Sequence, residues 1–437
     1  MVQSFPILVE GSPAFDETLA RLADRGASDL EAVTPTVREI LGEVRKSGAA
    51  AVQRYVETFE RRSPGALVLS SFDGEGALAR LEPAVREALT VAAERIERYH
   101  ARQREAGFLY DEDGVTLGMR VRPLRRVGVY APGGKARYPS SVLMSAIPAR
   151  VAGVKDIVLA TPAPDDRLLA AAHLSGVTSI LDAGGAQAIA ALAYGIEGLP
   201  RVDKIVGPGN AYVACAKKLV YGDVAIDGIA GPSEILVLAD EHADPALIAS
   251  DLLSQAEHDE DAYAILVTTS AALAEATAVE LGKQLMTLSR PAIIRASLEA
   301  HGVALVVSSR ARLIQIGDAL AAEHVALHVS EADALLEELH AAGAALVGEE
   351  TPVAVGDYYA GPSHVLPTGG AVRFGAPLGV YDFVTRTSVI RYSAEALRRH
   401  GPHVMTLARA EGLDAHAEAV EKRLARGRTV SKPQSGS

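Results

Sequence analysis

The stretch Ser179-Ile180-Leu181-Asp182-Ala183-Gly184-Gly185-Ala186 decides the fold of this 437-residue chain. It leads from a short apolar strand through a glycine turn into a helical segment, 186–194. The same order of strand, glycine loop and helix recurs around it, with strands predicted at 126–130, 156–160 and 204–206 and a helix at 211–220. Short apolar strands that alternate with helices are typical of βαβ units around a mostly parallel sheet.

A second series of apolar strands begins at residue 235, and helical patterns separate its members. The predicted strands are 235–238, 264–267, 303–307, 325–329 and 345–347. Upstream, apolar residues spaced three and four apart between 16 and 100 indicate mostly helix. The predicted fold class is therefore α/β, with two Rossmann-like parallel-sheet domains and small helical N- and C-terminal segments.

Four domain assignments follow from these patterns. Residues 1–25 are predicted to form an N-terminal arm, and 26–128 with 236–378 a discontinuous first α/β domain whose N-terminal part is helical. Residues 129–235 are assigned to a second α/β domain. Residues 379–437 are assigned to a C-terminal helical appendage, with a helix at 414–426 and a loose polar tail.

Composition restricts the class of partner. The formal net charge of −12 argues against nucleic-acid and anionic-membrane partners, because both select a basic surface. The start of the chain lacks a basic, apolar leader, and no segment has the length and apolarity of a membrane span, so we expect a cytoplasmic protein. The single cysteine, Cys215, excludes an internal disulfide, and its apolar helical surroundings predict a buried packing residue.

Three glycine loops are candidate ligand contacts, because ligands of parallel α/β sheets bind at the carboxyl ends of strands. The loops are 131–134, 182–187 and 206–210. None contains the G-x-G-x-x-G fingerprint, since Tyr212 stands at the third glycine position of the last loop. Each loop alone is either an ordinary turn or a ligand contact. Three in one domain favour a ligand, for which a dinucleotide is the natural hypothesis.

Two polar pairs are candidates for chemistry. Gln255 and His258 stand three residues apart, so a helix would present both on one face, where a divalent ion could bind. The same spacing is also common on ordinary polar helix faces. Glu323-His324 precedes a predicted strand and combines a group that titrates near neutrality with a carboxylate that can activate water. Glu-His also occurs at 241–242 and 257–258, so the dipeptide alone is not decisive.

Several longer segments, in this order, resemble the histidinol dehydrogenase family. The segments are Val127–Gly134, Gly184–Gly195, Val202–Asn210, Ile229–Ile235, Leu253–Asp259 and Gly356–Pro367. The resemblance implies a zinc-dependent enzyme that oxidises L-histidinol through L-histidinal to L-histidine with two NAD, at the end of histidine biosynthesis. It also implies a homodimer in which the C-terminal segment completes the partner's site, and it identifies the 129–235 domain as the NAD-binding one.

The resemblance also implies roles for individual residues. Zn²⁺ is expected at Gln255, His258, Asp357 and His416, which would also hold the substrate with Ser233, His324, His364 and Glu411. NAD is expected at Tyr130, Gln187 and Asn210, and proton transfer at Glu323 and His324. The same ligand set would accept Mn²⁺ or Co²⁺.

Some residues depart from the family's usual pattern and leave alternatives open. Ala322 stands where relatives usually have Pro, Val325 where Leu is usual, and Gly228 where a bulkier apolar residue is usual. His328 is an added histidine, interpreted as a strand residue and not a ligand. These changes bear on substrate selectivity. The alternatives are a related dehydrogenase of another alcohol, such as a sulfonated diol, and a non-catalytic zinc-stabilised binding protein.

Overall fold

The computed structural model describes residues 5–25, 30–133 and 138–426, which form two compact units. The first unit combines the described residues up to Arg104 with Leu124–Phe383. The second combines Glu105–Pro123 with the described residues from Val384 onward. Gly134, in the first glycine loop, and the predicted tail at 427–437 lie outside the described residues.

The first unit contains two six-stranded sheets, and the β5 sheet carries the three glycine loops. Its strand order is β2 (Val68–Leu69), β7 (Ser179–Leu181), β6 (Asp156–Ala160), β5 (Arg126–Tyr130), β8 (Lys204–Val206) and β9 (Ala225–Ile226). All neighbours are parallel except β2, which runs antiparallel to β7. The parallel order predicted from the repeated βαβ pattern is confirmed.

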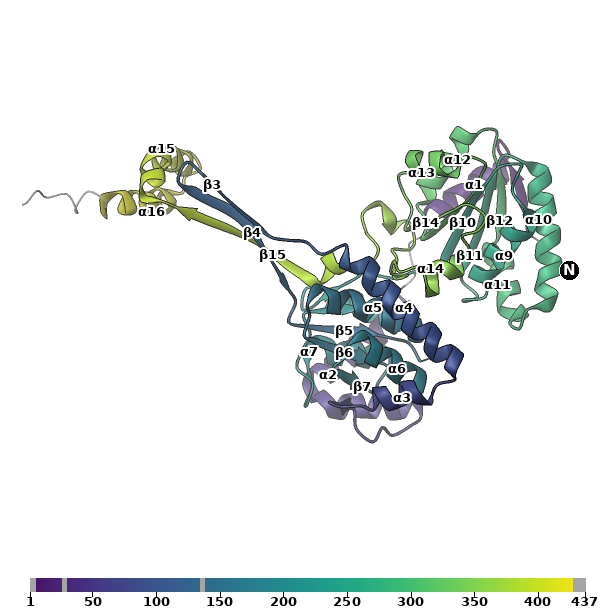
Figure 1. Cartoon of the computed structure of the whole chain (residues 1–437), viewed down its shortest axis with the longest axis horizontal. Coiled ribbons are helices and arrows are strands. Elements are labelled where there is room, and N and C mark those ends of the chain that lie inside the picture. Colours follow the sequence, from purple (N-terminus) through teal and green to yellow (C-terminus); the bar gives the residue numbers. More distant parts are fainter. Residues whose placement is uncertain (1–4, 26–29, 134–137, 427–437) are drawn as a thin grey trace, which may run out of the picture. The chain divides into compact units, whose positions relative to one another are not determined.

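Helices cover both faces of the β5 sheet (Figure 1). One face packs against α2 (Thr34–Tyr55), α7 (Gly185–Tyr194) and α8 (Ala211–Val220). The other packs against α4 (Pro83–Ala101), α5 (Pro139–Ala152) and α6 (Asp166–Ser175), with the short α3 (Gly74–Arg80) against α6. Helix α7 is alanine-rich and buried along nearly its whole length, so small side chains allow it to approach both the sheet and α2 closely.

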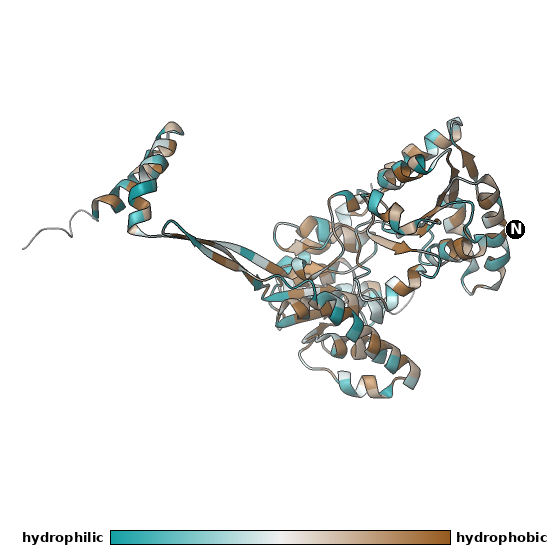
Figure 2. Cartoon of the chain, turned by 45° about the horizontal axis from the view of Figure 1, so that its top comes forward, coloured by the Kyte–Doolittle hydropathy of each residue, from teal (hydrophilic) through white to brown (hydrophobic). Residues whose placement is uncertain are grey.

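The β10 sheet is parallel throughout. Its order is β1 (Ile7–Val9), β12 (Val303–Val306), β11 (Tyr263–Thr268), β10 (Glu234–Ala239), β13 (His324–His328) and β14 (Ala344–Val347). One face is covered by α9 (Pro245–Ala256), α10 (Ala271–Gln284) and α11 (Pro291–His301), and the other by α1 (Pro13–Ala23), α12 (Arg310–Leu320) and α13 (Ala332–Glu338). Every residue of β10 and β13 is buried, as expected for central strands, and Figure 2 shows the apolar character of this sheet.

The second unit is an antiparallel three-stranded sheet followed by two helices. Strand β4 (Val115–Pro123) lies between β3 (Phe108–Glu112) and β15 (Val384–Tyr392), and α15 (Ala394–Ala410) packs against α16 (Asp414–Arg426). All five residues of β3 are exposed. The helix predicted at 414–426 is confirmed.

The structure corrects the predicted domain boundaries. The N-terminal segment is not an arm, because β1 pairs with β12 inside the β10 sheet. Residues 34–101 do not join 236–378, because their helices and β2 pack on the β5 sheet. The C-terminal segment is not purely helical, because β15 pairs with β4 along nine residues. An amphipathic pattern indicates that a helix buries one face, but it does not identify the sheet against which that face packs.

Two smaller expectations are also settled. Cys215 is buried in α8, 3.4 Å from the Thr34 hydroxyl, which confirms its packing role. Among the described residues, no helix has both the length and the apolarity needed to cross a membrane.

Candidate active site

The Glu323-His324 pair lies at the start of β13, buried beside β10. The Nδ1 atom of His324 lies 3.1 Å from the main-chain oxygen of Glu234, and its Nε2 lies 3.6 Å from Oδ1 of Asp357. Oε2 of Glu323 accepts a hydrogen bond from the Glu234 N–H at 2.9 Å. The structure therefore places the two proposed proton-transfer residues together, buried at the start of a central strand.

Neighbouring carboxylates control the charge of His324. Burial alone would lower the pKa of His324, but the charges of Glu323 and Asp357 raise it to about 10. Burial would raise the pKa of Asp357, but contact with His324 holds it below its ordinary value. These shifts favour an imidazolium at His324 beside the carboxylate of Asp357 at neutral pH.

We expect Glu323→Gln to lower the pKa of His324 from about 10 in metal-free protein. The substitution removes a negative charge that stabilises the imidazolium and leaves the burial that disfavours it, so the proton is lost at lower pH. An NMR titration of the His324 ring measures the change. The matched control is Glu241→Gln at the exposed Glu241-His242 pair, which should leave His324 unchanged. An unaltered pKa in Glu323→Gln would contradict the electrostatic account.

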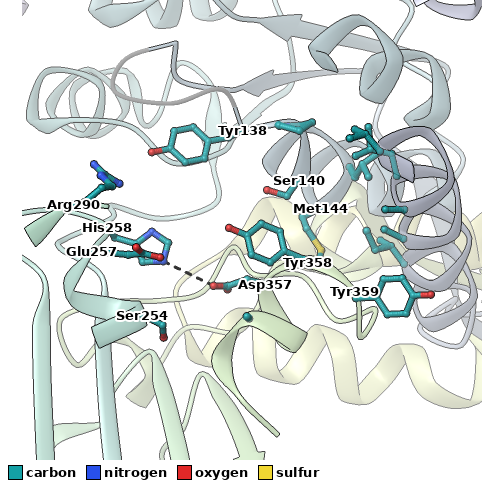
Figure 3. Close-up of a pocket in the computed structure, with 18 residues that line it drawn as sticks. Tyr138, Ser140, Met144, Ser254, Glu257, His258, Arg290, Asp357, Tyr358 and Tyr359 are labelled. Atoms are coloured by element: carbon teal, nitrogen blue, oxygen red, sulfur yellow. Dashed lines mark ion pairs between the residues drawn. The ribbon is translucent and has the colours of Figure 1, made fainter. Parts of the chain in front are cut away.

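His258 lies near Asp357, but it does not share a helix with Gln255 as predicted. Helix α9 ends at Ala256, and His258 follows in a turn in which its N–H donates to the Gln255 main-chain oxygen at 3.1 Å. His258 Nε2 lies 3.9 Å from Oδ2 of Asp357, the pair marked in Figure 3. The prediction fails because the chain leaves the helix after Ala256 and turns toward β11. Residue spacing alone does not indicate where a helix ends.

The side chain of Gln255 is 1% exposed, and neither its amide nitrogen nor its amide oxygen has a hydrogen-bond partner among the described residues. A buried amide without a partner is costly, so an external group is expected to satisfy it. The described residues contain no cluster of three His, Cys, Asp or Glu side chains that could hold a metal ion. The donors Gln255, His258 and Asp357 thus fit a divalent cation in chemical type, but as an incomplete ligand set that needs a further donor.

A cavity of about 530 Å³ opens beside these residues. Figure 3 shows Glu257, His258 and Asp357 on its wall together with Tyr138 and Tyr358. Helices α4 and α5 supply most of its apolar lining. A volume of this size and mixed lining are typical of a small-molecule site.

The remaining substrate candidates are divided between the two units. Ser233 directly precedes β10, and its main-chain oxygen accepts the Tyr263 N–H at 2.9 Å. His364 Nδ1 lies 2.9 Å from the main-chain oxygen of Asp357, and burial lowers the pKa of His364. Glu411 and His416 belong to the second unit, where Glu411 caps the end of α15 and His416 lies in the first turn of α16.

The three predicted cofactor residues follow strands of the β5 sheet. Tyr130 ends β5 and is buried; its hydroxyl accepts the Gly185 N–H at 3.0 Å, and burial raises its pKa to about 12. Gln187 lies buried in the first turn of α7. Asn210 caps α8, where its side-chain oxygen accepts the Val213 N–H at 3.2 Å. Their common position is the one at which α/β sheets bind ligands.

Two of the glycine loops use their N–H groups within the protein. The Glu60 carboxylate accepts the Gly184 N–H at 2.8 Å, and the Asp227 carboxylate accepts the Gly207 N–H at 2.7 Å. Gly207 has φ +115°, and a β-carbon there would collide with the main-chain oxygen of Tyr130. Gly207 is therefore explained by its positive φ and by close backbone approach, independently of any ligand.

Sequence reasoning missed Glu234, which contacts both members of the acid–base pair. It is 1% exposed, and its carboxylate is paired with Arg25. The available signal was a charged residue at the start of an otherwise apolar strand, Glu234-Ile235-Leu236-Val237. Charged side chains are seldom fully buried unless they are paired, so a glutamate in this apolar strand predicts a partner of opposite charge.

The fold and the buried acid–base pair define an α/β enzyme whose candidate site lies where β10 and β13 begin. The chain belongs to the histidinol dehydrogenase family, whose model matches residues 23–424, and it is an oxidoreductase. It is 48% identical to histidinol dehydrogenase of Pseudomonas aeruginosa over 420 residues, which cover 94% of this chain and 96% of that protein. It is also 48% identical to histidinol dehydrogenase of Aquifex aeolicus over 410 residues, covering 93% and 96%.

A solved structure supports the fold. The crystal structure of histidinol dehydrogenase from Elizabethkingia anophelis matches this chain with a TM-score of 0.90 at 32% identity, covering 97% of this chain and 98% of that one. The resemblance stated from the sequence motifs is thereby confirmed, as is the α/β fold class.

Proposed function

We propose that this chain oxidises L-histidinol through L-histidinal to L-histidine, in a zinc-dependent, four-electron reaction that reduces two NAD. The observation that carries the proposal is the buried Glu323-His324 pair beside Asp357, together with a buried Gln255 amide without a partner among the described residues. The family membership supplies the substrate class, because the relatives are named for histidinol oxidation.

Gln255, His258 and Asp357 are the residues of the first unit that would hold the zinc ion, with His416 as the fourth ligand. The ion would act as a template that binds the neutral amine and imidazole of histidinol. Its positive charge would also offset the charge of Asp357, which helps to raise the pKa of His324 in the free protein. Glu411 would accept a hydrogen bond from the imidazole of the substrate, next to Ser233 and His364. Tyr130, Gln187 and Asn210 would contact NAD.

In the first oxidation, His324 accepts the hydroxyl proton of histidinol while a hydride leaves the carbinol carbon for the first NAD. His324 must be neutral for this step. The product is an aldehyde, which the buried position of the pair protects from bulk water.

In the second oxidation, Glu323 removes a proton from water as the water oxygen bonds to the aldehyde carbon. The aldehyde oxygen takes back the proton that His324 accepted in the first oxidation, which gives a neutral hydrate. This hydrate loses a hydride to a second NAD and a hydroxyl proton to His324, and the carboxylic acid so formed ionises. The product is the carboxylate of histidine. Glu323 therefore acts on water and His324 on the substrate hydroxyl, although the two residues are adjacent in the sequence.

We expect the purified protein to produce two NADH for each histidinol consumed, and a chelator to abolish the activity until zinc is restored. Enzymatic counting of NADH against histidine measures the ratio, and metal analysis verifies removal. One NADH per histidinol, or full activity after verified removal of metal, would overturn the mechanism. Parallel assays with sulfonated diols and other amino alcohols test the alternative substrate class.

The second unit supports a homodimer. It buries few large apolar side chains but exposes many, namely Phe108, Leu109, Tyr110, Ile390, Tyr392, Val404, Leu407 and Leu413. Exposed apolar surface on so small a unit marks an interaction site, and a second copy of the chain is the partner proposed here. In that dimer, Glu411 and His416 of each chain complete the site of the other, which would supply the missing metal donor.

We expect complementation between two inactive variants. His258→Ala and His416→Ala should each abolish activity, but a heterodimer of the two, purified with two affinity tags, should retain about half of wild-type activity because one of its two sites is intact. As a control, a heterodimer of His416→Ala with Glu411→Ala should remain impaired at both sites, because both changes lie in the same exchanged segment. An inactive His258→Ala/His416→Ala heterodimer would exclude completion by the partner.

A further inference from the structure

We propose that Glu234 is a positioning residue that fixes the Glu323-His324 pair and sets which ring nitrogen of His324 carries the proton. This inference rests on the proposed catalytic role of that pair. Glu234 touches neither substrate nor cofactor in this account, and acts only through the two residues that do.

The Glu234 carboxylate is surrounded by donors from three separate segments. Its Oε1 accepts from Arg25 Nε at 3.0 Å and from the Gly369 N–H at 2.7 Å. Its Oε2 accepts from Arg25 Nη2 at 2.7 Å and from the Glu323 N–H at 3.3 Å. One buried side chain thus joins the end of α1, the loop after His364 and the start of β13.

The main chain of Glu234 completes the arrangement. Its N–H donates to Oε2 of Glu323, so Glu323 and Glu234 are linked reciprocally, each through a carboxylate and an N–H. Its carbonyl oxygen lies 3.1 Å from His324 Nδ1. Both members of the acid–base pair are therefore held by the same residue, whose side chain is anchored by Arg25.

These contacts determine the tautomer of His324. A carbonyl oxygen only accepts, so Nδ1 must be the donor in the bond to Glu234. A carboxylate oxygen lies 3.6 Å from each ring nitrogen, Oε2 of Glu323 from Nδ1 and Oδ1 of Asp357 from Nε2, so the Glu234 carbonyl is the contact that distinguishes the two nitrogens. Nε2 is then the free base of the neutral ring, and it points to the Asp357 side, where it lies 3.6 Å from Oδ1. Glu234 thereby directs the basic nitrogen toward the proposed substrate position.

The buried ion pair is better explained by positioning than by stability. Buried ion pairs stabilise folds little compared with apolar residues of similar size, because both charges are desolvated. Small displacements of catalytic groups, by contrast, reduce rates strongly. The side chains of Arg25 and Glu234 are each 1% exposed. Oε2 of Glu234 also accepts the N–H of Glu323, the residue beside His324.

The kinetic test uses a neutral version of the pair, because Glu234→Gln alone would leave the Arg25 charge buried and unpaired. The double variant Arg25→Met/Glu234→Gln should fold and lower kcat by about 10- to 100-fold, with a much smaller change in KM for histidinol. Glu234→Asp should recover part of the loss, because it keeps the charge. The control Glu10→Gln/Arg312→Met neutralises an ion pair of the same α/β domain that does not contact Glu323 or His324, and should retain wild-type kcat.

The tautomer is measured directly by ¹⁵N NMR of the histidine-labelled holoprotein, with His324 assigned by the loss of its signals in His324→Gln. We expect a protonated Nδ1 and an unprotonated Nε2 in the neutral wild-type ring, and a shift toward Nε2–H in the double variant. Wild-type protein with Nε2–H as the main neutral form would overturn the proposal. So would an unchanged kcat in a folded double variant; if that variant does not fold, the tautomer measured in the wild-type ring alone decides.

Failure of the proposed function has a different signature. If wild-type protein does not oxidise histidinol, the kinetic comparison has no baseline, yet the ring nitrogen that carries the proton is still measured. A correct tautomer without histidinol oxidation would refute the proposed function and leave the positioning by Glu234 intact. The reverse result would refute the positioning alone.

Discussion

His324→Asn is expected to lower kcat by about 10²- to 10⁴-fold with either histidinol or histidinal as the substrate. The reason is that one nitrogen base is proposed to accept the proton in both oxidations. Asparagine is smaller but keeps a hydrogen-bonding amide at this buried position, and it has no basic nitrogen. The loss should therefore appear in kcat for both substrates, with a smaller effect on binding.

Separate assays that begin from histidinol and from histidinal measure this prediction, and NADH absorbance gives the rate of each. His242→Asn is the matched control, because it makes the same change at an exposed histidine that also follows a glutamate. Unaffected oxidation of histidinal would restrict His324 to the first step. Unaffected oxidation of both substrates would remove it from the mechanism.

Glu323→Gln is expected to impair the second oxidation by about 10²- to 10⁴-fold and the first oxidation much less. Glutamine cannot take a proton from the attacking water. Its side-chain oxygen can still accept the Glu234 N–H that Glu323 accepts at 2.9 Å, so the strand start should keep its position. The variant should therefore release or accumulate the aldehyde.

Rapid mixing of Glu323→Gln with histidinol and NAD should show one equivalent of NADH per site formed quickly and the second formed slowly. An aldehyde-trapping reagent should capture histidinal from this variant and little from wild type. Glu241→Gln serves as the control, since it removes a carboxylate from an exposed Glu-His pair. Normal steady-state formation of histidine by Glu323→Gln would take Glu323 out of the water-activating role.

The two variants test a division of labour between adjacent residues. Glu323 and His324 share burial and share Glu234 as a hydrogen-bond partner. Their side chains nevertheless meet different groups, because His324 Nε2 points to Asp357 whereas Glu323 points to the Glu234 main chain. A loss confined to one step in Glu323→Gln and spread over both in His324→Asn is the pattern this geometry predicts.

Much of the candidate site was accessible from the sequence motifs, while its geometry was not. The motifs identified Glu323, His324, Gln255, His258 and Asp357, and contacts in the structure join all of these except Gln255. The helical spacing suggested for Gln255 and His258 was wrong, because α9 ends at Ala256. Helix ends depend on local hydrogen bonding and on the path of the following chain, which residue spacing describes poorly.

The structure also settles the interpretation of His328. It is a residue of β13, as predicted, and its Nε2 lies 3.0 Å from the buried Asp251 carboxylate of α9. This contact joins the strand that carries His324 to the helix that carries Gln255. Its partner could not be found from sequence, since 77 residues separate the two side chains.

The sequence by itself determined the repeated βαβ pattern, the parallel sheets and the family, because apolar strand runs, glycine turns and helical periodicity are local properties. Only the tertiary structure decided that residues 34–101 cover the β5 sheet, that β15 pairs with β4, and that Glu234 holds both Glu323 and His324. Those features depend on contacts between distant segments, and the energy of such contacts comes from packing and hydrogen bonding in three dimensions, which no single segment encodes.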